Sequence, residues 1–245
     1  MKTTGPVGGW KKLFAVGCSH GIHADPVALG QVLRFKERFK PDTTIHLGDA
    51  VDLAALRSGA KGTNDEHAPL SPDIDGGVEF LQQLRPTIFF YGNHEARITK
   101  FCHSHNAVVQ LAAQSIRTGL HDALRRMKSD VILYDGIYQG RVIGGVRYMH
   151  GVFYNENHCR DHAEAFGNVV FAHAHRAGVA TGRRADSPKG FCVGTLTRFA
   201  AMEYANTRRA TLGWSQGFVW GYYRDNCSQL WLREKNPNAP WLLPL

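Results

Sequence analysis

Five short apolar runs in this 245-residue chain end in residues that can bind a metal ion. The residues at these ends, in chain order, are Cys18, His20, Asp49, Asn93, His94, His150, His173 and His175. Thiolate, imidazole and carboxylate groups are the protein ligands of zinc, iron and manganese. Two such ions about 3.5–4 Å apart can clamp a phosphoryl group and activate water. The pattern therefore predicts a two-metal hydrolytic centre, provided that the five ends meet.

The first half of the chain supplies the elements that can bring these ends together. Residues 13–16, 43–47 and 87–91 are expected to form strands, and helical patterns separate them. Asp25 and Pro26 form a good helix start, and that helix should end before Pro41. This β-α-β order predicts a parallel sheet with its functional residues at the carboxyl ends of the strands.

The remaining segments are assigned by the same patterns of apolar and turn residues. Helical segments are expected at residues 49–56, 75–84, 96–128 and 159–166, and a surface loop at 57–72. A β-rich second half is expected to contain a hairpin over residues 142–149, strands at 131–134, 168–172, 179–181 and 191–193, and antiparallel edge strands at 213–223 and 229–232.

These elements predict one α/β domain over residues 1–245. Two mixed β-sheets are expected to pack face to face with helices on the outside, as a four-layer α-β-β-α sandwich. Residues 1–12 and 235–245 are expected to be loosely ordered tails.

The composition narrows the class of partner. Twenty-nine basic and 21 acidic residues give a net charge of +8, which favours polyanions such as nucleic acid or nucleotides, although a solvated surface explains the charge equally well. The sequence contains neither a run of 18 apolar residues nor a signal-peptide core, which predicts a cytoplasmic protein without membrane contact. Five cysteines without a C-x-x-C pair predict reduced thiols. The oligomeric state stays open.

The order of the motifs resembles the calcineurin-like metallophosphoesterase superfamily. That family reads D-x-H, G-D-x-x-D, G-N-H-E, a lone His and G-H-x-H. The matching residues here are Cys18-Ser19-His20, Gly48-Asp49-Ala50-Val51-Asp52, Gly92-Asn93-His94-Glu95, His150 and Ala172-His173-Ala174-His175. Phage-type and bacterial members are most similar, because they carry H-x-x-D-P after the first motif, here residues 23–26. The chain departs from the family at Cys18, where Asp is expected, and at Ala172, where Gly is expected.

The resemblance implies a role for each motif residue. Asp49 would bridge two divalent ions, which are expected to be Mn, Zn or Fe. The ligands that would complete the two metal sites are Cys18, His20 and His175 for one and Asn93, His150 and His173 for the other. His94 would act on the substrate as a protonated imidazole that Asp52 orients. Arg97 and His23 are candidates for substrate contact.

The other histidines carry no motif support. His46 is interpreted as structural, and the rest are expected on the surface: His103, His105, His121, His158 and His162.

The resulting hypothesis is a two-metal phosphoesterase that uses metal-activated water, first of all a nuclease or phosphodiesterase. A phosphomonoesterase is the alternative within the same chemistry. The alternative without catalysis is a binding module that has the metallophosphoesterase fold but is catalytically impaired. Cys18 can be a metal ligand, a bystander beside three other ligands, or a change that empties its site, and the first of these is the favoured hypothesis. A thiolate would shift the preference towards zinc or iron.

Overall fold

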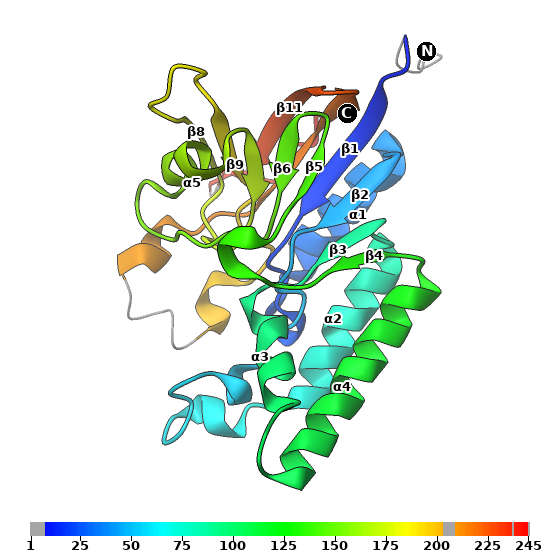
Figure 1. Cartoon of the computed structure of the whole chain (residues 1–245), viewed down its shortest axis with the longest axis vertical. Coiled ribbons are helices and arrows are strands. Elements are labelled where there is room, and N and C mark those ends of the chain that lie inside the picture. The colour runs from blue at the N-terminus through cyan, green and yellow to red at the C-terminus, as the bar shows by residue number, and fades with distance from the viewer. Residues whose placement is uncertain (1–7, 203–208, 237, 245) are drawn as a thin grey trace.

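The apolar runs that end in potential metal ligands form strands of two mixed β-sheets (Figure 1). The computed structural model describes residues 8–202, 209–236 and 238–244. The first sheet has the strand order β11-β10-β1-β2-β3-β4. Its strands are β1 (Lys11–Val16), β2 (Thr43–His46), β3 (Ile88–Phe90), β4 (Asp130–Ile132), β10 (Gly217–Arg224) and β11 (Cys227–Glu234). Strands β1 to β4 are parallel, β10 pairs antiparallel with β1, and β11 pairs antiparallel with β10.

The second sheet has the strand order β5-β6-β7-β9-β8. Its strands are β5 (Arg141–Ile143), β6 (Val146–Tyr148), β7 (Val169–Phe171), β8 (Gly178–Thr181) and β9 (Lys189–Cys192). The three central strands are parallel, and β5 and β8 are antiparallel to their neighbours. The sandwich core lies between the sheets, where Leu13 and Ile45 of the first sheet cluster with Val170 of the second.

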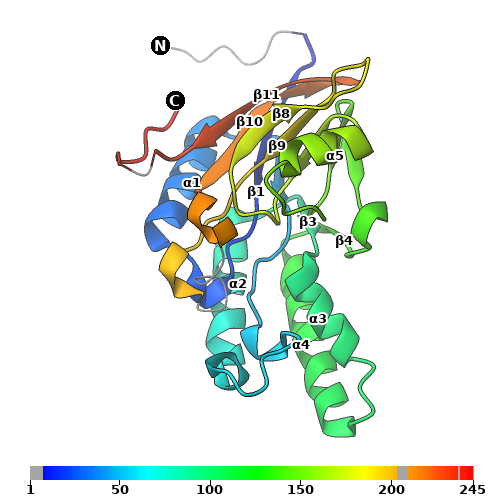
Figure 2. The ribbon, with the colours of Figure 1, turned by 90° about the vertical axis from the view of Figure 1, so that its left-hand side faces the viewer.

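Helices cover both outer faces of the sandwich. They are α1 (Pro26–Phe39), α2 (Leu70–Leu84), α3 (Asn93–Phe101), α4 (Ala107–Arg126) and α5 (His158–Phe166). Asp25 caps α1 by accepting hydrogen bonds from the next two backbone N–H groups after Pro26. The first four helices lie on the side of the first sheet and α5 lies on the second (Figures 1 and 2).

Short 3₁₀ turns complete the described elements, at Gly21–His23, Ala54–Leu56, Asn64–His67, Gly136–Tyr138, Phe199–Ala201 and Arg209–Gly213. None of the helices in the described ranges combines the length and the apolar content that a membrane crossing requires.

The predicted four-layer sandwich is confirmed, with four local corrections. Residues 213–223 were expected to hold an edge strand, but β10 is interior because β11 pairs along its outer side. α2 begins at Leu70, inside the predicted loop. The segment predicted as helical over residues 96–128 forms two helices, α3 and α4, and α3 begins at Asn93 rather than at residue 96.

The predicted tails are shorter than expected where the structure describes them. Lys11 and Lys12 pair with β10, and Trp241 packs on Phe218 with ring centroids 6.1 Å apart. Residues 1–7, 237 and 245 of these predicted tails lie outside the described residues.

Two glycines allow the turns after β2 and β3 to touch. Gly48 has φ +97°, and an added Cβ would lie 2.9 Å from Nδ1 of His150. A Cβ on Gly92 would collide with Oδ1 of Asp49 and lie 2.6 Å from the Asp49 backbone nitrogen. A side chain at either position would push Asp49 away from its neighbours.

We predict that Gly92→Ala destabilises the protein by about 1–3 kcal/mol, because the added methyl overpacks this contact. Gly30→Ala is the matched control, since a Cβ there meets nothing within 4 Å and the residue lies inside α1. It should stabilise the protein by about 0.5–1 kcal/mol. Urea denaturation of both variants measures the difference, and an equal effect of the two substitutions would contradict the close-contact account.

Candidate metal centre

The five predicted strand ends meet at one edge of the sandwich. Three of them follow β1, β2 and β3 of the first sheet, and two follow β6 and β7 of the second. The side chains that arrive there are Cys18, His20, Asp49, Asn93, His150, His173 and His175, and most of them are buried. The parallel direction of these strands brings their carboxyl ends to the same edge, as the β-α-β pattern predicted.

Five of these seven residues have left-handed backbone conformations. Their φ values lie between +53° and +59°, and the residues are Cys18, His20, Asp49, His173 and His175. A non-glycine residue in this region costs about 1–2 kcal/mol. Such strain is typical of sites where function fixes the direction of a side chain. Backbone hydrogen bonds hold two of these turns together, because the N–H groups of Cys18 and His20 donate to the carbonyls of Gly48 and Asp49.

The first group of potential ligands contains Cys18, His20, Asp49 and His175. One ligand atom from each lies within 4.8 Å of all the others. Nε2 of His20 is 3.0 Å from Nε2 of His175, and all four residues are nearly inaccessible to solvent. This geometry fits one ion held by sulfur, nitrogen and oxygen.

The second group contains Asp49, His150 and His173, whose ligand atoms also lie within 4.8 Å of one another. Oδ1 of Asn93 is 2.9 Å from Nε2 of His150 and 3.0 Å from Nδ1 of His173. Asp49 is common to both groups, as a bridging carboxylate would be.

The donor set fits metal ions better than it fits a hydrogen-bond network. Nδ1 of His150 donates to the carbonyl of Leu47 at 2.8 Å, which in the neutral ring leaves Nε2 as a lone pair. Nε2 lies 3.3 Å from Oδ2 of Asp49 and 3.2 Å from Nδ1 of His173. Burial lowers the pKa of His150, but Asp49 outweighs this effect and raises it, so a protonated ring faces the carboxylate where a cation would otherwise lie. Nδ1 of His20 likewise donates to Asp52, so Nε2 faces His175 without a proton. Converging lone pairs repel unless a cation lies between them.

The pKa values of His173 and His175 suit metal binding. Burial lowers the pKa of His173 to about 3 and lowers the pKa of His175 well below its usual value. Both imidazoles are therefore uncharged at neutral pH, the form that binds metal. Burial alone would raise the pKa of Asp49, but the neighbouring His150, His94 and His20 together hold that pKa well below its ordinary value.

Cys18 lies inside the first group rather than beside it. Its Sγ accepts a hydrogen bond from the backbone N–H of His173 at 3.3 Å. Burial, followed by the charge of Asp49, raises the pKa of this thiol well above its ordinary value. A thiol in such surroundings ionises when a metal ion supplies the compensating positive charge. This placement agrees with the hypothesis that Cys18 is a ligand, and a bystander beside the three other residues stays the alternative.

Asp52 orients two histidines instead of the one that was predicted. Its Oδ1 is 2.9 Å from Nδ1 of His20 and 3.2 Å from Nδ1 of His94. Its backbone carbonyl also accepts a hydrogen bond from Nδ1 of His94 at 2.6 Å. A carboxylate that holds the distal nitrogen of a ligand histidine fixes its tautomer and its direction.

His94 lies against the first group but points its Nε2 towards Arg97. Burial lowers the pKa of His94, but Asp49 and Asp52 outweigh this effect and the pKa is raised overall. Nη2 of Arg97 is 3.1 Å from Nε2 of His94, and Nη1 donates to the carbonyl of Asp52 at 2.7 Å. The contact with Arg97 suits a neutral ring with its proton on Nδ1, so protonation of Nε2 would release the guanidinium.

His23 is a partly exposed candidate residue near Asp52. Its Nε2 lies 3.8 Å from Oδ2 of Asp52, and 23% of its side chain is accessible to solvent. Among the residues that the structure describes, that buried Asp52 oxygen has no hydrogen-bond partner. Arg97 and His23 therefore flank Asp52.

Two buried carboxylates that were given no role hold the ligand loops in place. Glu95 accepts hydrogen bonds at 2.7–2.9 Å from the backbone N–H groups of Asp49, Ala50 and Gly92. Asp73 does the same at 2.7–3.0 Å for Leu53 and Asp52. The Asn-His-Glu motif contained a signal for Glu95, whereas nothing in the sequence around Asp73 indicated its role.

His158 and His162 were predicted on the surface, and this prediction was wrong. Both are buried on the inner face of α5. Nε2 of His162 accepts a hydrogen bond from the N–H of Val152 at 3.0 Å, and Nε2 of His158 donates to the carbonyl of Arg176 at 3.0 Å. Because Val152 follows His150 and Arg176 follows His175, α5 fixes both loops from the second sheet. The remaining prediction about His46 agrees with its burial and its contact with the N–H of Gly48.

Comparisons with known proteins add a distant likeness. No family model and no curated protein matches the chain. A structure described as a novel archaeal phosphodiesterase is 12% identical with a TM-score of 0.45, covering 91% of this chain and 99% of that one. YfcE, a phosphoesterase from E. coli, is 19% identical with a TM-score of 0.39, covering 86% and 91%. A single mutant of Vps29 from Entamoeba histolytica is 10% identical with a TM-score of 0.39, covering 92% and 99%. At these sequence identities and TM-scores, the functional inference rests on the geometry of the site.

We predict that Glu95→Gln lowers metal affinity about 10–100-fold, because an amide group cannot accept from all three backbone donors. Stability should fall by about 1–3 kcal/mol as a buried donor loses its partner. Glu79→Gln is the control, since Glu79 is exposed on α2. Competition with a chelating dye measures the affinity. Unchanged affinity in Glu95→Gln would show that Glu95 does not position Asp49.

We predict that Cys18→Asp lowers the preference for zinc over manganese by about tenfold or more, because an oxygen ligand replaces a soft sulfur. Cys227→Ser is the control for adventitious thiol binding, as Cys227 is an exposed free thiol. Metal competition followed by elemental analysis gives both occupancies. If Cys18→Asp leaves occupancy and preference the same, Cys18 is not a ligand.

Proposed function

We propose that this protein is a metal-dependent phosphoesterase that holds two divalent ions and hydrolyses phosphoester bonds with activated water. The observation that supports this most strongly is the sharing of Asp49 by two groups of converging ligand atoms. In such a centre the ions supply Lewis acidity and a nucleophile at neutral pH. The donor set of imidazole and carboxylate groups with one thiolate suits Mn, Zn or Fe, and the sulfur favours zinc or iron.

The chain's own residues supply positioning and proton transfer. His94 has its Nε2 3.7 Å from Oδ2 of Asp49, close to both metal groups, yet belongs to neither ligand set in the proposal. Its Nδ1 is fixed by Asp52, so Nε2 is the atom that can approach a leaving-group oxygen. A histidine held in this way can act as a general acid. Arg97, which touches this same nitrogen, can stabilise a phosphoryl oxygen once His94 is protonated.

We further propose a phosphodiester substrate in a nucleic acid or nucleotide. The net charge of +8 supports a polyanionic substrate over a neutral one. The five free thiols, four of them buried, support a reducing compartment such as the cytoplasm. A catalytically impaired binding module is less well supported, because two groups of potential ligand atoms still converge at Asp49 despite the change at Cys18.

We predict that His94→Ala keeps its bound metal and loses about 10²–10⁴-fold in kcat, because the substitution removes a proton donor and leaves every proposed ligand. The assay is hydrolysis of bis-p-nitrophenyl phosphate and of a single-stranded oligonucleotide, with metal content measured on the same samples. His103→Ala is the control, since His103 is exposed and lies at the end of α3.

Normal turnover in His94→Ala would contradict the catalytic role. Loss of metal in the same variant would make His94 a ligand instead. If the unmodified protein hydrolyses only p-nitrophenyl phosphate, the phosphomonoesterase alternative replaces the diesterase. Absence of turnover with every substrate and metal would favour the binding module.

A further inference from the structure

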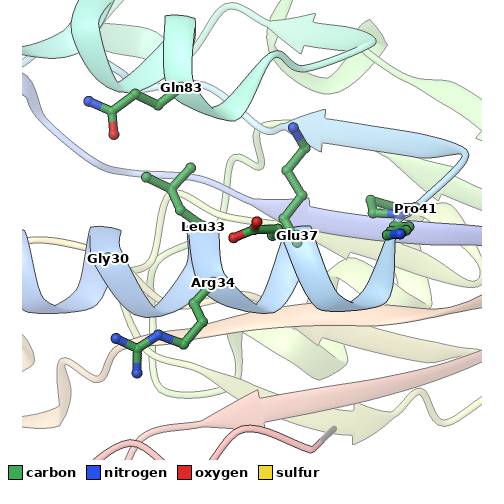
Figure 3. A pocket seen from close by; sticks show the side chains of 8 residues that line it. Gly30, Leu33, Arg34, Glu37, Pro41 and Gln83 are labelled. Atoms are coloured by element: carbon green, nitrogen blue, oxygen red, sulfur yellow. The ribbon is translucent and has the colours of Figure 1, made fainter.

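A groove between α1 and α2 lies outside the metal centre. Its volume is about 740 Å³, and Figure 3 shows Leu33, Arg34 and Glu37 along α1, with Gln83 on α2. Lys36 and Lys40 also line it. This volume is in the range of small-ligand pockets, which suits a few nucleotides of a single strand.

The cations of this groove are not neutralised by the protein. Within the described part of the chain, Arg34, Lys36 and Lys40 form no ion pair, and Glu37 is the one carboxylate in the lining. Burial and then the charge of Arg85, at the end of α2, lower the pKa of Lys36. By contrast, Arg57 and Arg141 each have an aspartate partner. Crowded like charges destabilise a fold, and a bound anion would remove that cost.

The cations of the groove lie along the second half of α1 and just past its end. This helix runs from the carboxyl end of β1 back to the amino end of β2, and Lys40 is the first residue past its end, shortly before β2 begins. The 14 residues of α1 span about 20 Å. The metal ligands follow the opposite ends of these strands, so the cations lie towards the far end of the molecule from them.

We propose that this groove binds the phosphodiester backbone of a single-stranded nucleic acid. Arg34, Lys36 and Lys40, with Arg85 at the edge, are the phosphate contacts, and the half-buried position of Lys36 fixes one charge within the groove. Backbone contacts of this kind carry no base preference. The groove itself does not depend on the proposed hydrolysis, but its use to anchor a substrate rests on the proposed function.

The test is binding of a fluorescein-labelled 12-nucleotide DNA strand by metal-loaded protein that carries His94→Asn to prevent turnover. Each lost phosphate contact lowers the salt slope, log Kd against log salt, by about 0.7 on a single strand. Arg34→Gln combined with Lys36→Gln should therefore reduce the slope by about 1.4, which weakens binding about 25-fold at 0.1 M salt. Glu37→Gln should act in the opposite direction and tighten binding, because it removes the carboxylate of the lining.

The matched control is Arg183→Gln combined with Lys189→Gln, which removes two exposed cations from the second sheet and its preceding loop. It should leave the slope within about 0.3 of the unsubstituted value. With His94 intact, the Arg183 and Lys189 double variant should hydrolyse bis-p-nitrophenyl phosphate normally, which shows that the loss of two cations does not by itself disturb the centre.

If the Arg34 and Lys36 double variant and the Arg183 and Lys189 double variant weaken oligonucleotide binding equally, net charge alone explains the binding and the proposal is wrong. Absence of oligonucleotide binding together with binding to phosphatidylserine vesicles would overturn it in favour of a lipid surface. If the protein hydrolyses no phosphoester but its oligonucleotide binding still depends on the groove residues, the proposed function is wrong and the proposal about the groove is supported.

Discussion

The structure depends on one buried carboxylate that several partners share. Oδ1 of Asp49 accepts the backbone N–H of His94 at 3.0 Å, while Oδ2 faces His150 at 3.3 Å. An isolated carboxylate in a site only 1% exposed is unfavourable by several kcal/mol, so it requires nearby positive charge. The glycines at 48 and 92 and the left-handed turns are consequences of bringing this group into contact with both sheets. Glu95 adds a second buried carboxylate close by, and burial followed by the charge of Asp49 raises its pKa.

This arrangement links stability to ligand binding. Turns with positive φ and converging lone pairs all cost free energy in the absence of a cation. A cation that binds the folded chain and not the unfolded one recovers that cost by mass action. The loops are also held by α5 and by the carboxylates Asp73 and Glu95. Residues outside the ligand set therefore organise the centre through hydrogen bonds with the backbone of its loops. Metal should therefore act on the stability of the protein as well as on its chemistry.

The sequence was informative wherever a local pattern decides the structure. Asp25 and Pro26 set the start of α1, and the motifs after β1, β2 and β3 indicated which side chains would meet, since strand direction determines the edge at which they lie. Contacts between distant segments could not be predicted. The aromatic pattern of β10 does not reveal that β11 covers its outer side. Asp73 and the two buried histidines of α5 bind backbone groups far along the chain, and only the folded topology brings those groups near.

Metal content is the measurement that tests the central claim most directly. Protein purified without chelator should contain close to two equivalents of a divalent transition metal per chain by elemental analysis, and dialysis against EDTA should remove both ions together with a large part of the thermal stability. Protein that contains less than half an equivalent, takes up none on addition of Zn²⁺ or Mn²⁺, and melts at the same temperature with and without EDTA would contradict the two-metal centre around Asp49.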